Sequence, residues 1–170
     1  MKDLSVDFYG AEMRNGGRRL ARSTRAGMLR GMRAQAEDGF PCRHCGAFVS
    51  SAIALAGVVN RNHCPYCLWS RHLDLERAGD RLSACKAPMK PVGLTQKRTA
   101  KKYGGAGELM LVHRCTGCAR VSLNRLAADD DPQAVLAVFE GSLRGEFFDR
   151  EIEVLGIDSQ RLVEEQLFGR

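Results

Sequence analysis

Cysteines are the residues of this chain best suited to do chemistry, because six of its seven cysteines form pairs separated by two residues. The pairs are Cys42/Cys45, Cys64/Cys67 and Cys115/Cys118, and Cys85 stands alone. Two intervening residues allow both thiolates of a pair to bind one ion from a tight turn, with metal–sulfur distances of about 2.3 Å. A thioredoxin-like redox centre needs a single such pair in a βαβ context, and three pairs without that context argue against it. The spacing therefore predicts zinc binding.

The first two pairs predict one four-sulfur zinc site, formed by Cys42, Cys45, Cys64 and Cys67. Gly46 directly follows Cys45, which is typical of a zinc knuckle, where a small residue lets backbone amides face the sulfurs. Residues 47–59 predict a hairpin. Residues 68–79 have helical character, so we expect Cys67 near a helix N-terminus, where the helix dipole favours a thiolate. A knuckle, a hairpin and a cysteine pair at a helix start are the order of a treble clef.

The three remaining cysteines, Cys85, Cys115 and Cys118, predict a second site that needs a histidine as its fourth ligand. His72 follows Cys67 by five residues. On the predicted helix it is therefore rotated by about 140° from Cys67 and faces away from the first ion. His113, two residues before Cys115, is the main rival. We favour His72 and keep His113 as the alternative; the other two histidines are His44 and His63. The sequence thus predicts two Zn²⁺ ions per chain.

The elements that position these ligands divide the chain of 170 residues into three parts. Residues 1–39 form a basic arm, rich in arginine and glycine, that we expect to order on a partner. Residues 40–128 contain every cysteine and predict a small α+β domain, stabilised by zinc, of the treble-clef or zinc-ribbon type. Residues 129–170 predict an acidic helical extension. Its first helix is expected to begin with Asp131 as N-cap and Pro132 at the first position, and a second at Asp158.

Charge is strongly segregated along the chain, whose net charge is +6. From residue 126 onward there are eleven acids and four arginines, which gives 4 − 11 = −7. The basic parts favour a polyanion partner. The residues expected to contact nucleic acid are Arg14, Arg18, Arg19, Arg22, Arg25, Arg30 and Arg33 in the arm, and Lys97, Arg98, Lys101 and Lys102 in a basic loop.

Nothing in the sequence resembles a signal peptide, and no apolar run approaches the roughly 18 residues of a membrane span. Paired thiols in such a chain point to metal binding in a reducing compartment. We therefore expect a cytoplasmic protein that does not contact a membrane.

The pentapeptide Arg61-Asn62-His63-Cys64-Pro65 gives the middle of the chain a named pattern. Together with the leading Cys42-x-x-Cys45-Gly46 and the later His113-x-Cys115-x-x-Cys118, it makes residues 40–131 resemble the RNHCP domain family. The resemblance implies a bacterial metal-binding domain and supports the ligand assignment, but it implies no activity.

Three functions are compatible with these features. The first is binding of structured RNA, with ribosomal RNA or the ribosome as the expected partner and with zinc supplying stability that a small core lacks. The second is a protein-interaction adaptor that uses the acidic C-terminal helices. The third is catalysis, which we do not expect, because eight ligands for two ions leave no coordination position open for water.

Overall fold

The computed structural model describes residues 39–97, 107–145, 147, 149 and 152–169, which belong to one compact unit. Apart from Gly39, the predicted basic arm lies outside these residues. The predicted RNA contacts outside them are Arg14, Arg18, Arg19, Arg22, Arg25, Arg30, Arg33, Arg98, Lys101 and Lys102. Only Lys97 of that set is described.

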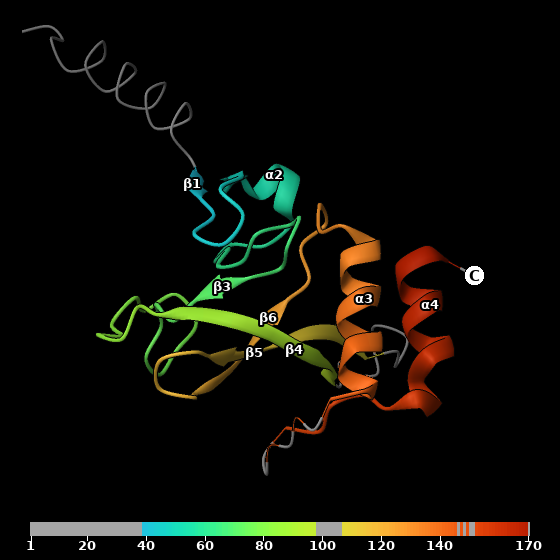
Figure 1. The fold of residues 1–170 in the computed structure, drawn as a ribbon. Coiled ribbons are helices and arrows are strands. Elements are labelled where there is room, and N and C mark those ends of the chain that lie inside the picture. Colours follow the sequence, from blue (N-terminus) through green and yellow to red (C-terminus); the bar gives the residue numbers. More distant parts are fainter. Residues whose placement is uncertain (1–38, 98–106, 146, 148, 150–151, 170) are drawn as a thin grey trace, which may run out of the picture. The chain divides into compact units, whose positions relative to one another are not determined.

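Two antiparallel sheets and two C-terminal helices build this unit (Figure 1). In the smaller sheet, β1 (Gly39–Pro41) pairs with β2 (Phe48–Ser50), and a single helical turn, α2 (Ile53–Ala56), follows. The larger sheet has the strand order β3-β4-β5-β6. Its strands are β3 (Ser70–Arg71), β4 (Pro88–Lys97), β5 (Glu108–Cys115) and β6 (Val121–Arg125). The α+β class predicted from the sequence is confirmed.

Helix α3 (Pro132–Leu143) begins as predicted, with the Asp131 side chain accepting a hydrogen bond from the Gln133 amide at 3.0 Å. A 3₁₀ turn, η2 (Ile157–Ser159), then leads into α4 (Gln160–Phe168), two residues later than the predicted start. Between the helices, the Leu155 amide donates to the Leu94 carbonyl of β4 at 2.8 Å. The segment between α3 and α4 is thus hydrogen-bonded to a part of β4 that does not pair with β3.

The main core lies between the larger sheet and the two helices (Figure 1). Its buried side chains are Leu68, Leu94, Leu109, Leu111, Val135, Phe139 and Val163. The apolar positions of the two helices thus face the sheet, and their charged positions remain outside. The acidic extension predicted from residue 129 consequently shares its core with the zinc-binding part.

Two local predictions are wrong. Residues 47–59 do not form a hairpin, because β2 pairs back onto β1 and α2 follows. The helix predicted over residues 68–79 is replaced by β3 and a loop. In that loop the Asp80 carboxylate accepts hydrogen bonds from the Leu75, Glu76 and Arg77 amides, each at 2.9 Å. Aspartate competes for backbone amides in this way, which disfavours a helix.

Candidate metal centres

All three Cys-x-x-Cys segments adopt the same backbone turn. In each, the amide of the residue after the second cysteine donates to the carbonyl of the first cysteine. The three hydrogen bonds are Gly46 to Cys42 at 3.0 Å, Leu68 to Cys64 at 2.9 Å and Ala119 to Cys115 at 3.1 Å. The residue after each second cysteine has a left-handed φ, of 79° at Gly46, 60° at Leu68 and 60° at Ala119.

The second pair is therefore a knuckle, and the prediction that Cys67 lies at a helix N-terminus is wrong. A leucine in the left-handed region is unusual and costs about 1–2 kcal/mol. The Leu68 side chain is fully buried in the main core, and this burial offsets the cost. The second knuckle was not recognisable from the sequence because its left-handed position holds Leu68, a large apolar residue, where a small residue is usual.

The first candidate centre contains Cys42, Cys45, Cys64 and Cys67. The Cys42 and Cys67 Sγ atoms lie 3.6 Å apart, and so do those of Cys45 and Cys64. A disulfide requires about 2.05 Å between sulfurs, whereas sulfurs bound tetrahedrally at 2.3 Å from zinc lie about 3.8 Å apart. The spacing fits a shared zinc ion.

The second candidate centre contains His72, Cys85, Cys115 and Cys118. His72 follows β3, Cys85 precedes β4, and the last two belong to the knuckle after β5. The Cys85 and Cys115 Sγ atoms lie 3.7 Å apart, and His72 Nδ1 lies 3.2 Å from the Cys118 Sγ. The four ligand atoms all lie within 4.8 Å of one another. Each of the two sets can thus hold one zinc ion, consistent with two Zn²⁺ per chain.

Close packing around the second centre depends on Gly117. A Cβ atom at this position would lie 2.9 Å from the Ala87 Cβ and 3.4 Å from the Cys85 Sγ. The third knuckle therefore lies so close to the loop of Cys85 that a side chain at position 117 would push the knuckle and this loop apart.

His113 is excluded from either centre by its own hydrogen bonds. Its Nε2 donates to the Leu68 carbonyl at 2.7 Å, and its Nδ1 accepts from the Asn124 amide nitrogen at 2.9 Å. Burial lowers the pKa of His113 to about 4, so the ring is neutral at physiological pH. Both ring nitrogens are occupied, and His113 packs the second knuckle against the sheet. His72 was reached from the sequence by a helix argument that is wrong, although the residue itself lies in the cluster.

The cysteine thiols of the two clusters differ in pKa, and therefore in how readily they lose the proton that metal binding displaces. Burial alone raises the pKa of Cys42, but the Cys45 and His44 amides outweigh it and lower the pKa to about 7. In the same way, burial of Cys115 is outweighed by the Cys118 and Gly117 amides, and its pKa falls to about 6. Cys42 and Cys115 thus lose their protons more readily than an ordinary thiol. Burial raises the pKa of Cys64 and Cys67, so a bound cation favours loss of their protons.

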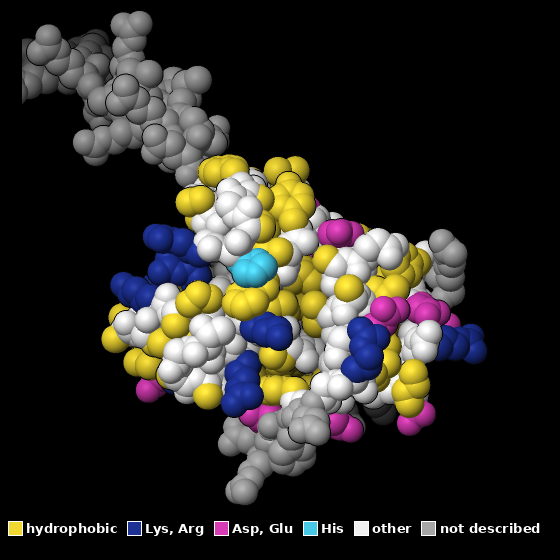
Figure 2. All heavy atoms as spheres, in the orientation of Figure 1, with side chains coloured by type: hydrophobic (Ala, Val, Ile, Leu, Met, Phe, Trp, Pro, Cys, Tyr) yellow, Lys and Arg dark blue, Asp and Glu magenta, His cyan; other side chains and the backbone are white. Residues whose placement is uncertain are grey.

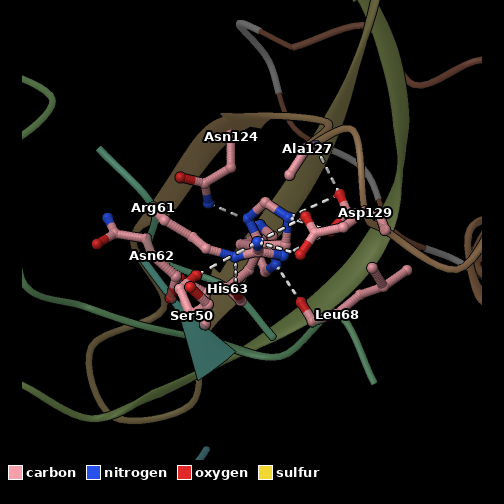
Figure 3. A network of polar contacts seen from close by, with 11 residues as sticks. Ser50, Arg61, Asn62, His63, Leu68, Asn124, Ala127 and Asp129 are labelled. Atoms are coloured by element: carbon pink, nitrogen blue, oxygen red, sulfur yellow. Dashed lines mark hydrogen bonds and ion pairs between the residues drawn. The ribbon is translucent and has the colours of Figure 1, made fainter. Parts of the chain in front are cut away.

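A buried polar network fixes the loop that carries the first centre (Figure 3). Arg61, whose side chain is fully buried, donates to both Asp129 carboxylate oxygens at 2.6 and 2.7 Å and to Asp130 at 3.2 Å. His63 Nε2 donates to Asp130 at 2.8 Å. These bonds join the residues just before Cys64 to the residues just before α3.

The neighbouring residues of the pentapeptide are also engaged. The Asn62 side chain donates to Asp74 at 3.1 Å and accepts from Arg81. The Pro65 carbonyl accepts from the Asp131 amide, the N-cap of α3, at 3.0 Å. The pentapeptide therefore fixes the second knuckle to two other segments and is structural.

Comparison with known families agrees with this arrangement. Residues 37–136 match the family model of the RNHCP domain, which covers more than half of the chain. The chain belongs to the RNHCP domain family. No curated protein and no solved structure matches it. The matched region of the RNHCP domain includes both metal centres and ends within α3.

Sequence reasoning missed the partners of the RNHCP pentapeptide. Asp129 and Asp130 were placed at the start of the acidic extension and at the end of the stretch that resembles the RNHCP family, without any partner. In the structure both neutralise Arg61, and Asp130 also binds His63. Their position directly before a capped helix gave no indication of a buried ion pair. The only sequence signal was the opposite charge of the adjacent acids and the Arg61-Asn62-His63 segment.

The basic residues of the RNHCP domain are not equivalent. Arg125 is neutralised by Glu108, with hydrogen bonds of 2.6 and 2.9 Å. Lys97, at the end of β4, is exposed, and so are Lys90 and Arg114. Among the described residues, no helix is long and apolar enough to cross a membrane.

Proposed function

We propose that this chain is a structural zinc protein of the cytoplasm that binds structured RNA through its RNHCP domain, with ribosomal RNA as the partner class. Each metal centre has four protein ligands, which suits structural zinc and leaves no position for a reacting water. We also propose that the first centre is of the zinc-ribbon type, since two knuckles face each other there.

The observation that supports RNA binding best is a pair of like charges on adjacent strands. Lys90 of β4 is directly opposite Arg114 of β5. Like charges in this position destabilise a sheet. Neither residue has a carboxylate within 4.0 Å in the described part of the chain. A phosphate that bridges the two side chains would remove the repulsion.

The pair borders an open groove beside the third knuckle. The groove has a volume of about 720 Å³, and its lining includes Thr116, Gly117 and Phe147 but no acidic residue. Polar atoms, two cations and an aromatic ring fit an RNA backbone with a base beside it. The basic arm would add further phosphate contacts, as its seven arginines suggest.

Filter binding of the full-length zinc-loaded protein to ribosomal RNA tests this proposal. Replacing Lys90 and Arg114 by glutamine should weaken binding and reduce the slope of log affinity against log salt by about 0.7, the value for the loss of one phosphate contact. The matched control is Arg144→Gln with Arg161→Gln, which removes one exposed charge at the C-cap of α3 and one from α4. If both double variants bind alike, or the wild type binds no RNA at low salt, the proposal is wrong.

The adaptor role remains the second candidate, favoured by acidic residues on the faces that α3 and α4 leave exposed. Glu140 and Glu165 lie on these faces, while Val135, Phe139 and Val163 are buried in the core. Deleting the helices would therefore damage the domain. Replacing Glu140 and Glu165 by glutamine separates the candidates, since only an adaptor would lose its partner.

A further inference from the structure

A cavity beside the first metal centre is lined by four arginines and no acidic residue. It has a volume of about 260 Å³, and Arg43, Arg61, Arg71 and Arg81 contribute to its wall together with Phe40 and Asn62. Arg43 lies inside the first knuckle, and Arg71 ends β3. Segments far apart in the sequence thus bring several arginines to the wall of one hollow.

Two of these arginines carry charge that the described residues do not neutralise. Arg61 is committed to Asp129 and Asp130. Arg81 lies 3.8 Å from an Asp74 oxygen. Arg43 and Arg71 form no salt bridge within the described ranges, and Arg71 donates to the Lys86 carbonyl at 3.2 Å. Two partly exposed guanidinium groups at a cavity without carboxylates favour an anion with several oxygens.

A second, smaller hollow of about 90 Å³ adjoins the arginine-lined cavity and is aromatic. The two share Phe40, Arg43 and Arg71 in their walls, and the smaller one adds His44 and Trp69. The His44 and Trp69 rings are stacked, with centroids 4.2 Å apart and planes inclined by 6°. His44 is exposed, so its outer face can extend the stack. Figure 2 shows one face of the molecule where Lys and Arg side chains lie beside hydrophobic ones and a histidine.

We infer that these adjoining hollows bind one unpaired RNA nucleotide, with its phosphate at Arg43 and Arg71 and its base on the His44–Trp69 stack. This inference rests on the proposed RNA binding and names where an unpaired base would be held. Flat aromatic faces beside guanidinium groups suit a base that has left its helix, because stacking requires an accessible base face. A paired base within a duplex presents no free face, so the site selects loops and bulges.

Trp69 is the only tryptophan of the chain, so its fluorescence reports on this site. We expect a single-stranded oligouridine titrated into full-length zinc-loaded protein to quench Trp69 saturably. Arg71→Gln should raise the Kd at least about tenfold, since a charged hydrogen-bonding partner is lost. Arg71→Lys should have a smaller effect because it keeps the charge. Zinc content and circular dichroism of each variant verify its fold.

The control is the Arg144→Gln, Arg161→Gln double variant, which should leave both the Kd and the full amplitude of Trp69 quenching unchanged. RNA binding in the filter assay without any quenching would overturn the nucleotide site and leave the proposed function standing. Equal quenching by inorganic phosphate and by oligouridine would show an anion site without base recognition and would also overturn it. If Arg71→Gln and Arg43→Gln both bind oligouridine with unchanged affinity, the nucleotide site is also overturned. Absence of RNA binding in every assay would contradict both proposals.

Discussion

The three knuckles place different residues in the same left-handed position, and each residue meets a different demand. Gly46 adopts this conformation freely. Leu68 is fully buried, so its side chain compensates for the backbone strain. Ala119 is exposed and has neither advantage. The strain at Ala119 is therefore not offset within the described structure.

Replacing Ala119 by glycine should stabilise the zinc-loaded protein by up to about 1 kcal/mol. The left-handed conformation costs alanine about 1–2 kcal/mol, and the greater freedom of glycine in the unfolded chain returns part of that gain. Urea denaturation measures the difference. Leu68→Gly is the matched control and should destabilise the protein by about 2–5 kcal/mol, because a core side chain is lost. Destabilisation by Ala119→Gly would show that the knuckle is not strained.

At the scale of elements, the pentapeptide network connects a loop without regular structure to the start of α3. Replacing Arg61 by methionine should destabilise the protein by about 3 kcal/mol, because the buried Asp130 loses a cationic partner. Urea denaturation at constant zinc measures the change. Adding Asp129→Asn and Asp130→Asn should recover part of the loss, since no unpaired carboxylate then remains. A cost of less than about 1 kcal/mol for Arg61→Met would contradict this role.

The loop after β3 depends on Asp80. Its carboxylate accepts from the amides of Arg77, Glu76, Leu75 and Leu82, and these bonds hold the pKa of Asp80 well below its usual range. A lowered pKa gives stabilisation that is complete above the unfolded value of about 3.9 and is lost as the pH falls below it. Asp80→Asn should therefore speed hydrogen exchange of these amides at neutral pH. The difference from wild type should shrink below about pH 4; a difference that is absent at neutral pH would contradict the assignment.

How far sequence reasoning reached is clearest at this scale. The start of α3 was predicted because its signal is local, with Asp131 as cap and Pro132 after it. The helix over residues 68–79 was wrong because Asp80 takes the amides a helix would need and because burial of Leu68 imposes a left-handed turn. Burial of Leu68 in the main core is a long-range cause that leaves no local pattern. The six paired cysteine ligands were predictable from their spacing alone, and Cys85 was the cysteine left over for the second site.

At the scale of the molecule, metal replaces hydrophobic packing where the core is thin. Around the first centre the buried cluster consists of Cys42, Val49 and Cys64. Structural zinc contributes on the order of 10 kcal/mol of apparent binding energy, comparable to the stability of a whole domain. The main core under α3 and α4 supports the sheet, and the two centres hold the loops that the sheet does not reach. Basic residues lie beside both centres, Arg43 and Arg71 at the first and Lys90 and Arg114 at the second.

The most direct test is the zinc content of the full-length protein and of two histidine variants, measured by native mass spectrometry. The wild type should carry two zinc ions per chain. His72→Ala should carry one, because the second centre loses its nitrogen ligand. His113→Ala should keep two and lose only packing, because its ring nitrogens bind Leu68 and Asn124. A single ion in the wild type, or loss of zinc from His113→Ala but not from His72→Ala, would contradict the two-centre account.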